Sequence, residues 1–186
     1  QAKSKTLAEK AAWDFINGQE GDAPMELTVM APGVVFGPPL GSNISGQSLS
    51  LMDQMLRGKV PMVPNGAFPM VDVRDVSKLH MQALAMPEAA GKRIIVSSAE
   101  PVGLTSVAQF LKDAGYKGPS TRIAPNFLQR LMAKFDREAK GLLTFLDMNL
   151  SADISETRDL FGWRPIPIKQ SVLDTATAIK AIKGKP

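Results

Sequence analysis

The chain has 186 residues, 44% of them hydrophobic and 22% charged, a balance that predicts a folded domain with a real core and argues against a disordered chain. No apolar run reaches the roughly 18 residues that a membrane-spanning helix needs, and the first residues lack the apolar core of a signal peptide, so we expect a cytoplasmic protein without membrane contact. The absence of cysteine and the single histidine argue against a metal site, and a net charge of +4 with only 6% aromatic residues argues against nucleic-acid binding.

The first third of the sequence predicts a helix, a strand and a loop in close succession. Apolar residues recur at helical spacing up to Ile16, and Gly18 stands where a left-handed C-terminal cap belongs. The short apolar run 26–31 is typical of a buried strand in a parallel sheet. Pro32 and the glycines after it end that strand, and a further helix is expected near 48–57. A strand that follows a helix so closely predicts an α/β fold.

The rest of the sequence predicts mostly helices with short strands between them. Residues 68–71 can form an extended segment, and Asp72 can cap a helix that should end before Pro87. The run 92–97, with Ile94-Ile95-Val96 at its centre, predicts a second strand. Further helices are expected at about 105–114, 126–146, 153–162 and 169–182.

The first chemical motif is the opening Gln1-Ala2-Lys3-Ser4-Lys5-Thr6-Leu7-Ala8-Glu9-Lys10-Ala11-Ala12-Trp13. It resembles the active-site helix of the extended short-chain dehydrogenase/reductases, in the branch similar to dihydroflavonol and aldehyde reductases, where Tyr-x-x-x-Lys precedes Thr-x-Ala-Glu-x-Ala-Ala-Trp. The resemblance places Lys5 at the catalytic lysine, which also holds the ribose hydroxyls of the cofactor, and Gln1 at the tyrosine. Residues four apart share a helix face, so an ammonium there lowers the pKa of a phenol and makes it a better general acid. An amide cannot serve in this way, so Gln1 departs from the family pattern.

A second motif, Pro32-Gly33-Val34-Val35-Phe36-Gly37-Pro38, resembles the Pro-x-x-Val-x-Gly-Pro signature that follows the sixth strand of the family's nucleotide-binding sheet. The resemblance implies cofactor contacts at Pro32, Gly33, Val34 and Val35, where backbone groups can meet a nicotinamide carboxamide, and at Ser48 in the next helix. The segments 71–76 and 153–163 resemble two looser family elements. In the first of them, Asp72 and Arg74 are expected to cap and to form ion pairs rather than to catalyse.

The resemblance covers nearly the whole chain and implies the C-terminal part of a Rossmann-type parallel sheet with a smaller, mainly helical substrate-binding domain. We expect 1–40 to end the NAD(P)-binding domain and 41–186 to form mainly the substrate-binding domain, with 71–98 as a segment that can return to the first. The glycine-rich phosphate loop that begins this fold is not in the sequence. We therefore expect an N-terminal half of the same protein as a partner, and a homo-oligomer stays open.

The resemblance also implies a reaction. The parent protein is expected to reduce a small ketone or aldehyde to an alcohol with NADP(H), or with NAD(H), while these residues alone are inactive. We expect an apolar substrate pocket lined by Phe36, Leu40, Phe68, Met70 and the helical region 127–146. Two alternatives stay open: a nucleotide-sugar epimerase or dehydratase of the same superfamily, and a catalytically inactive NAD(P)-binding relative, which Gln1 suggests.

Overall fold

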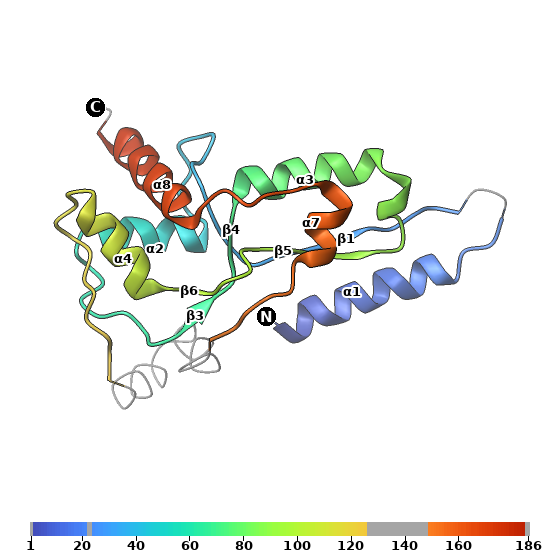
Figure 1. Ribbon diagram of the computed structural model, residues 1–186, viewed down its shortest axis with the longest axis horizontal. Coiled ribbons are helices and arrows are strands. Elements are labelled where there is room, and N and C mark those ends of the chain that lie inside the picture. The colour runs from blue at the N-terminus through green and yellow to red at the C-terminus, as the bar shows by residue number, and fades with distance from the viewer. Residues whose placement is uncertain (1, 22–23, 126–148, 185–186) are drawn as a thin grey trace.

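The chain folds into helices and short strands in the computed structural model, which describes residues 2–21, 24–125 and 149–184 (Figure 1). The helices are α1 (Ala2–Asn17), α2 (Gln47–Leu56), α3 (Val73–Ala85), the short 3₁₀ helix η1 (Pro87–Ala89), α4 (Leu104–Asp113), α7 (Ser155–Phe161) and α8 (Ile168–Lys183). The strands are β1 (Val29–Pro32), β2 (Val34–Phe36), β3 (Ala67–Phe68), β4 (Met70–Asp72), β5 (Arg93–Val96) and β6 (Val102–Gly103). β1–β5 and β2–β4 are parallel pairs, and β3–β6 is antiparallel. The predicted α/β class is confirmed. Within the described ranges, no helix has the length and apolar character needed to cross a membrane.

One extended segment, formed by β1 and β2, pairs with two different parallel strands. β1 pairs with β5 and β2 pairs with β4, and the change of partner falls at Gly33. The Gly33 N–H donates to the Val96 carbonyl at 3.0 Å, whereas the Val34 N–H donates to the Pro69 carbonyl at 2.9 Å. A Cβ atom at position 33 would lie 2.4 Å from the Pro69 carbonyl oxygen, so only glycine fits this crossing.

The β2–β4 ribbon separates two hydrophobic cores, because successive side chains of a strand point to opposite faces. Val35 and Val71 face the first, here called the sheet core, which contains Val71, Leu79, Ala89, Ile94, Val96, Ile154, Phe161 and Trp163. Phe36 and Met70 face the second, here called the helical core, which contains Phe36, Met52, Met55, Val63, Met70, Leu104, Val107, Ala108, Leu111, Ile168, Val172, Ala176 and Ile179. The strand ribbon is thus a wall shared by both cores.

Two local predictions at the start of the chain need correction. The strand expected at 26–31 begins only at Val29, and Val29, Met30 and Ala31 are half-buried rather than buried. Because the side chains of a strand point to the two faces of the sheet, the faces of β1 are only partly covered in the described structure. Gly18 does not adopt the left-handed conformation. Its N–H donates to the Asp14 carbonyl at 3.1 Å as in a helical turn, and the positive φ, 117°, occurs later, at Gly21.

Aspartate side chains bond the backbone at the starts of α3 and α7. Asp72 is the N-cap of α3, where its Oδ1 accepts the Arg74 N–H at 2.8 Å. At the start of α7, Asp153 Oδ1 accepts the Ser155 N–H at 2.9 Å. Glu156, in the first turn of α7, forms an ion pair with Lys92 at 2.7 Å. The helix expected at 153–162 ends at Gly162, which has the left-handed conformation with φ 57°.

Helix α1 lies largely in solvent. An ion pair between Glu9 and Arg93 at 2.7 Å links it to the sheet, and Trp13 and Ile16 are half-buried. Leu7 and Phe15 keep 55% and 64% of their surface exposed, so much of the apolar surface of this helix is uncovered.

The crossing at Gly33 leads to a stability prediction. We expect Gly33→Ala to lower the free energy of unfolding by about 2 kcal/mol or more, because the added methyl group would overlap the Pro69 backbone. Urea unfolding monitored by circular dichroism measures the change. Gly41→Ala is the matched control, since a Cβ atom there meets nothing within 4 Å. Equal midpoints for the two variants would contradict the role given to this crossing.

Candidate functional site

The two motif segments lie toward the same end of the β1–β5 pair. Figure 1 shows α1 and β1 running in opposite directions. The ion pair places Glu9 beside Arg93, the first residue of β5. Lys5 precedes Glu9 by four residues, about 6 Å along a helix, and is therefore displaced toward the carboxyl ends of the strands. In open α/β sheets, ligands bind beyond these ends. Gln1 lies outside the described residues.

The sheet uses two of the backbone donors in the loop 32–35. Gly33 and Val34 give their N–H groups to Val96 and Pro69, as described above, and Pro32 has no N–H to give. Successive N–H groups of an extended strand point to opposite edges, so the Val35 N–H points away from β4. If this loop holds a ligand amide, Val35 is therefore its candidate backbone donor. The sequence motif did not distinguish among these four positions.

The residues assigned to the cofactor differ in exposure. Lys5 and Pro32 are exposed, and Val34 keeps 38% of its surface exposed. Gly33, Val35 and Ser48, in the first turn of α2, are half-buried. The exposed positions leave this part of the structure open to a ligand or to another part of the protein.

The residues assigned to a substrate pocket are distributed differently. Phe36 and Met70 are 2% and 0% exposed and belong to the helical core. Phe68 is half-buried in β3, and Leu40 is fully exposed at the end of the Pro-rich loop. The region 127–146 lies outside the described residues. The pocket assignment therefore stays a prediction.

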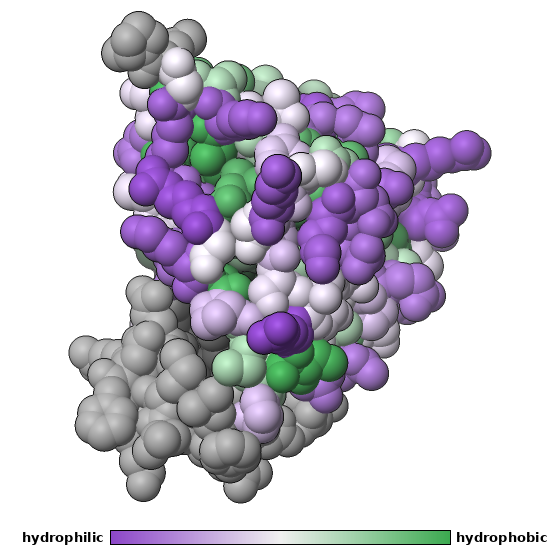
Figure 2. Space-filling view, turned by 90° about the vertical axis from the view of Figure 1, so that its left-hand side faces the viewer, coloured by the Kyte–Doolittle hydropathy of each residue, from purple (hydrophilic) through white to green (hydrophobic). Residues whose placement is uncertain are grey.

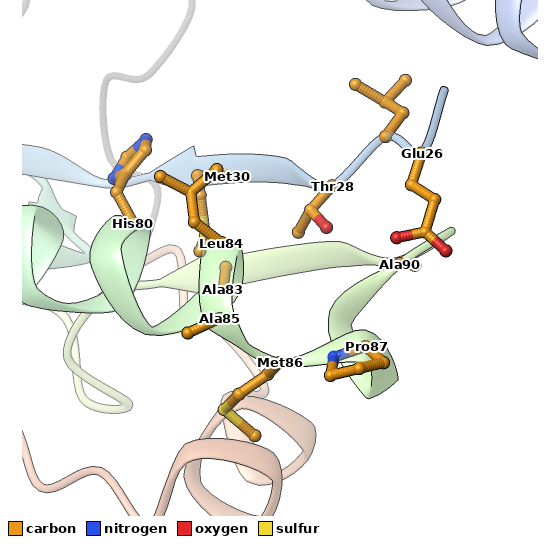
Figure 3. A pocket seen from close by; sticks show the side chains of 11 residues that line it. Glu26, Thr28, Met30, His80, Ala83, Leu84, Ala85, Met86, Pro87 and Ala90 are labelled. Atoms are coloured by element: carbon orange, nitrogen blue, oxygen red, sulfur yellow. The ribbon is translucent and has the colours of Figure 1, made fainter. Parts of the chain in front are cut away.

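A hollow of about 420 Å³ lies beside the other end of β1. Figure 3 shows it between the segment 26–30 and the C-terminal part of α3, with Glu26 at one end and His80 at the other. Its walls are mostly apolar, with Met30, Leu84 and Met86 among the lining side chains. His80 is exposed and its Nδ1 donates to the Val76 carbonyl at 2.7 Å, a contact within its own helix. The hollow thus lacks the convergent polar groups of a catalytic site.

A polar cluster around the buried Asp72 joins α3 to α8. Arg74 donates to both carboxylate oxygens of Asp72, at 2.9 and 2.7 Å, and to Asp174 Oδ2 at 2.7 Å. Burial alone would raise the pKa of Asp72, but the hydrogen bonds from Arg74 outweigh it and hold this pKa below its ordinary value. The hydrogen bonds to Asp72 and Asp174 raise the pKa of Arg74. The sequence predicts the capping and ion pairing of Asp72 and Arg74. It carries no local signal for Asp174, which is 100 residues away.

Relatives that match the chain are oxidoreductases. Two uncharacterized oxidoreductases of Saccharomyces cerevisiae are 27% and 29% identical over 98% and 95% of the chain. The NADPH-dependent methylglyoxal reductase of the same yeast is 35% identical over 101 residues, 52% of this chain and 30% of that protein. The chain spans about half the length of the first two relatives. No protein-family model matches it.

Solved structures match nearly the whole described fold. The yeast methylglyoxal/isovaleraldehyde reductase in complex with NADPH has a TM-score of 0.74 and 26% identity, over 97% of this chain and 55% of that one. The UDP-glucose 4-epimerase of Thermotoga maritima, with a TM-score of 0.60 and 18% identity over 84% of this chain and 47% of that one, shares the fold. These matches confirm the Rossmann-type fold and the resemblance inferred from the motifs.

The polar cluster leads to a prediction for acid unfolding. Because the pKa of Asp72 is lower in the folded state than its ordinary value of 3.8, the carboxylate stabilises the fold above that pH and loses this effect as pH falls through the folded value. The advantage of the wild type over Asp72→Asn should therefore be largest near neutral pH and shrink below about pH 4. Thermal unfolding of both proteins, measured at intervals of about one pH unit between pH 2 and 7, tests this. A constant difference across the range would contradict it.

Proposed function

Because this chain belongs to the extended short-chain dehydrogenase/reductase superfamily, we propose that it is the C-terminal half of an oxidoreductase that uses NADPH to reduce a ketone or aldehyde to an alcohol. The observation that supports this proposal most strongly is the match over 97% of the chain to a reductase whose structure contains NADPH. NADH is the alternative cofactor. The relatives that share more than 30% identity are named as reductases, of which one is a ketoreductase of Aspergillus niger.

We propose distinct roles for the two motif segments. NADPH would supply the hydride when bound. The Lys5 ammonium, one turn before Glu9, would hold the ribose hydroxyls, and the Val35 N–H would bind the carboxamide and fix the orientation of the ring. In a helix the residue four before Lys5 shares its face, which makes this position the natural place for a proton donor. Gln1 stands there, and an amide is not a general acid of useful strength. We therefore propose that these residues alone are inactive.

The domain assignment follows the two cores. We propose that the sheet core, with β1, β5, α3 and α7, belongs to the nucleotide-binding domain, and that the helical core, with α2, α4 and α8, belongs to the substrate-binding domain. Residues 71–98 then return to the first domain, because Val71, Ile94 and Val96 lie in the sheet core. The end of the molecule with α2, α4 and α8 is mostly hydrophilic (Figure 2).

We propose an N-terminal half as the partner that covers the opposite side. Large apolar side chains are exposed on α1, before β1 and on α3: Leu7, Phe15, Met25, Met81 and Leu84. The backbone edge of β1 that faces away from β5 has no strand partner in the described structure. Such surfaces favour association with another chain or segment. A homo-oligomer that buries the same side is the alternative.

The two other superfamily activities are weaker proposals. The epimerase similarity, at 18% identity, concerns the fold. An inactive binding protein is favoured by Gln1 alone. Substrate tests on the complete protein separate these cases. Turnover of UDP-glucose without reduction of aldehydes or ketones would favour the epimerase, and NADPH binding without any turnover would favour the inactive relative.

The first functional prediction concerns the purified chain. Calorimetric titration with NADPH and with NADH should show no binding in the micromolar range, because the glycine-rich loop that holds the pyrophosphate in this fold is absent from the sequence. An assay with methylglyoxal should show no oxidation of NADPH. Micromolar binding by a monomer would mean that these residues contain the main anion site and would contradict the proposed division into halves.

The second concerns Lys5 in the complete protein. If that protein is active, Lys5→Met should weaken NADPH binding about ten- to a hundred-fold, because a hydrogen bond from a charged group contributes roughly 1.5–3 kcal/mol. Lys10→Met is the matched control, because Lys10 is an exposed lysine of the same helix outside the motif spacing. Similar losses in both variants would point to a general effect on α1 and reject the role of Lys5.

A further inference from the structure

The two cores meet at the carboxyl end of the β2–β4 ribbon, and α8 crosses this end. Phe36 is in register with Asp72, the last residues of their strands. The next residue, Gly37, has φ 135°, and a Cβ atom there would lie 2.5 Å from Val73 Cγ1. The backbone at Gly37 therefore packs directly against Val73, the first residue of α3.

Two polar connections join this junction to the middle of α8. The Gly37 N–H donates to Thr175 Oγ1 at 2.8 Å, and the Thr175 hydroxyl donates to the Ser171 carbonyl at 2.6 Å. The second connection runs from Asp72 through Arg74 to Asp174, with the distances given above. Both reach the same turn of α8. One starts on β2 and the other on β4, so the helix is bonded to both strands of the ribbon.

The residues of these connections differ in their exposure to water. Asp72 and Thr175 are 0% exposed. The side chains of Arg74 and Asp174 are 44% and 28% exposed. The Asp174 end can therefore be removed without leaving a buried group unpaired, whereas loss of Arg74 would strand the buried Asp72 carboxylate.

We propose that Asp174 is a positioning residue, which through Arg74 fixes the orientation of α8 on the β2–β4 ribbon and so sets the helical core relative to the loop 32–35. Hydrophobic contact is non-directional, so packing of Val172 and Ala176 alone does not select one orientation. A guanidinium that bonds both oxygens of one carboxylate and reaches a second acid adds geometric specificity. The functional meaning of the loop rests on the proposed function, whereas the latch formed by Asp72, Arg74 and Asp174 rests on the geometry alone.

The test compares two ion pairs of α8. Asp174→Ala removes the contact to Arg74, which lies on α3. Lys183→Met is the matched control, because Lys183 pairs with Asp53 of α2 at 2.6 Å, inside the helical part of the molecule. Hydrogen exchange of the Gly37 amide, followed by NMR, reports whether α8 keeps its place on the ribbon. We expect this exchange to accelerate roughly three- to ten-fold in Asp174→Ala, an intermediate change in Asp174→Asn and no change in Lys183→Met.

A second readout follows each core separately. Trp163 lies in the sheet core, and Tyr116 packs against the helical core. With Trp13→Phe as the common background, urea unfolding followed by tryptophan and by tyrosine fluorescence should give coincident midpoints in the parent and in Lys183→Met. In Asp174→Ala the tyrosine midpoint should fall below the tryptophan midpoint. Unchanged Gly37 exchange, or a shift of both midpoints together, would overturn the proposal. Neither readout involves a cofactor, so this outcome is independent of the proposed reaction.

Discussion

The packing of the whole chain depends on the backbone contact at Gly33. One extended segment must pair first with β5 and then with β4, and the two partners approach it so closely that the Pro69 carbonyl takes the place of a side chain. Because the partner changes there, the sheet core forms around β1 and β5 while the helical core forms on one face of β2 and β4. The loop assigned to the cofactor is this same contact, so the structural constraint and the candidate site coincide.

The sequence predicts those features whose cause is local. Helical periodicity, Asp72 before α3 and Gly162 after α7 locate helices to within a residue or two, since each cap is a bond between near neighbours. Gly18 was misassigned because a glycine permits a left-handed cap but does not require one. The α8 contacts of Arg74 and Gly37 span 100 and 138 residues, so no spacing rule could reveal them.

The candidate site shows the same division. The spacing of the two motifs predicts that Lys5 and the loop 32–35 belong to one cofactor site. The directions of α1 and β1 are compatible with this prediction. The distinction between Val35 and its neighbours needs the hydrogen bonds of the sheet. The residues chosen for a pocket by apolar character alone include Phe36 and Met70, which are core residues. An apolar side chain after a strand carries no information about whether it faces a ligand or a core.

The weak attachment of α1 has a practical consequence. This helix carries Lys5, but a partly exposed ion pair to Arg93 and a few half-buried side chains hold it to the sheet. The proposed N-terminal half, by docking on this side, would cover the apolar residues of α1 and complete the site in one step. The proposed division into halves would therefore suit fragment complementation, in which NADPH binding by the mixture reports that two separately produced pieces have associated.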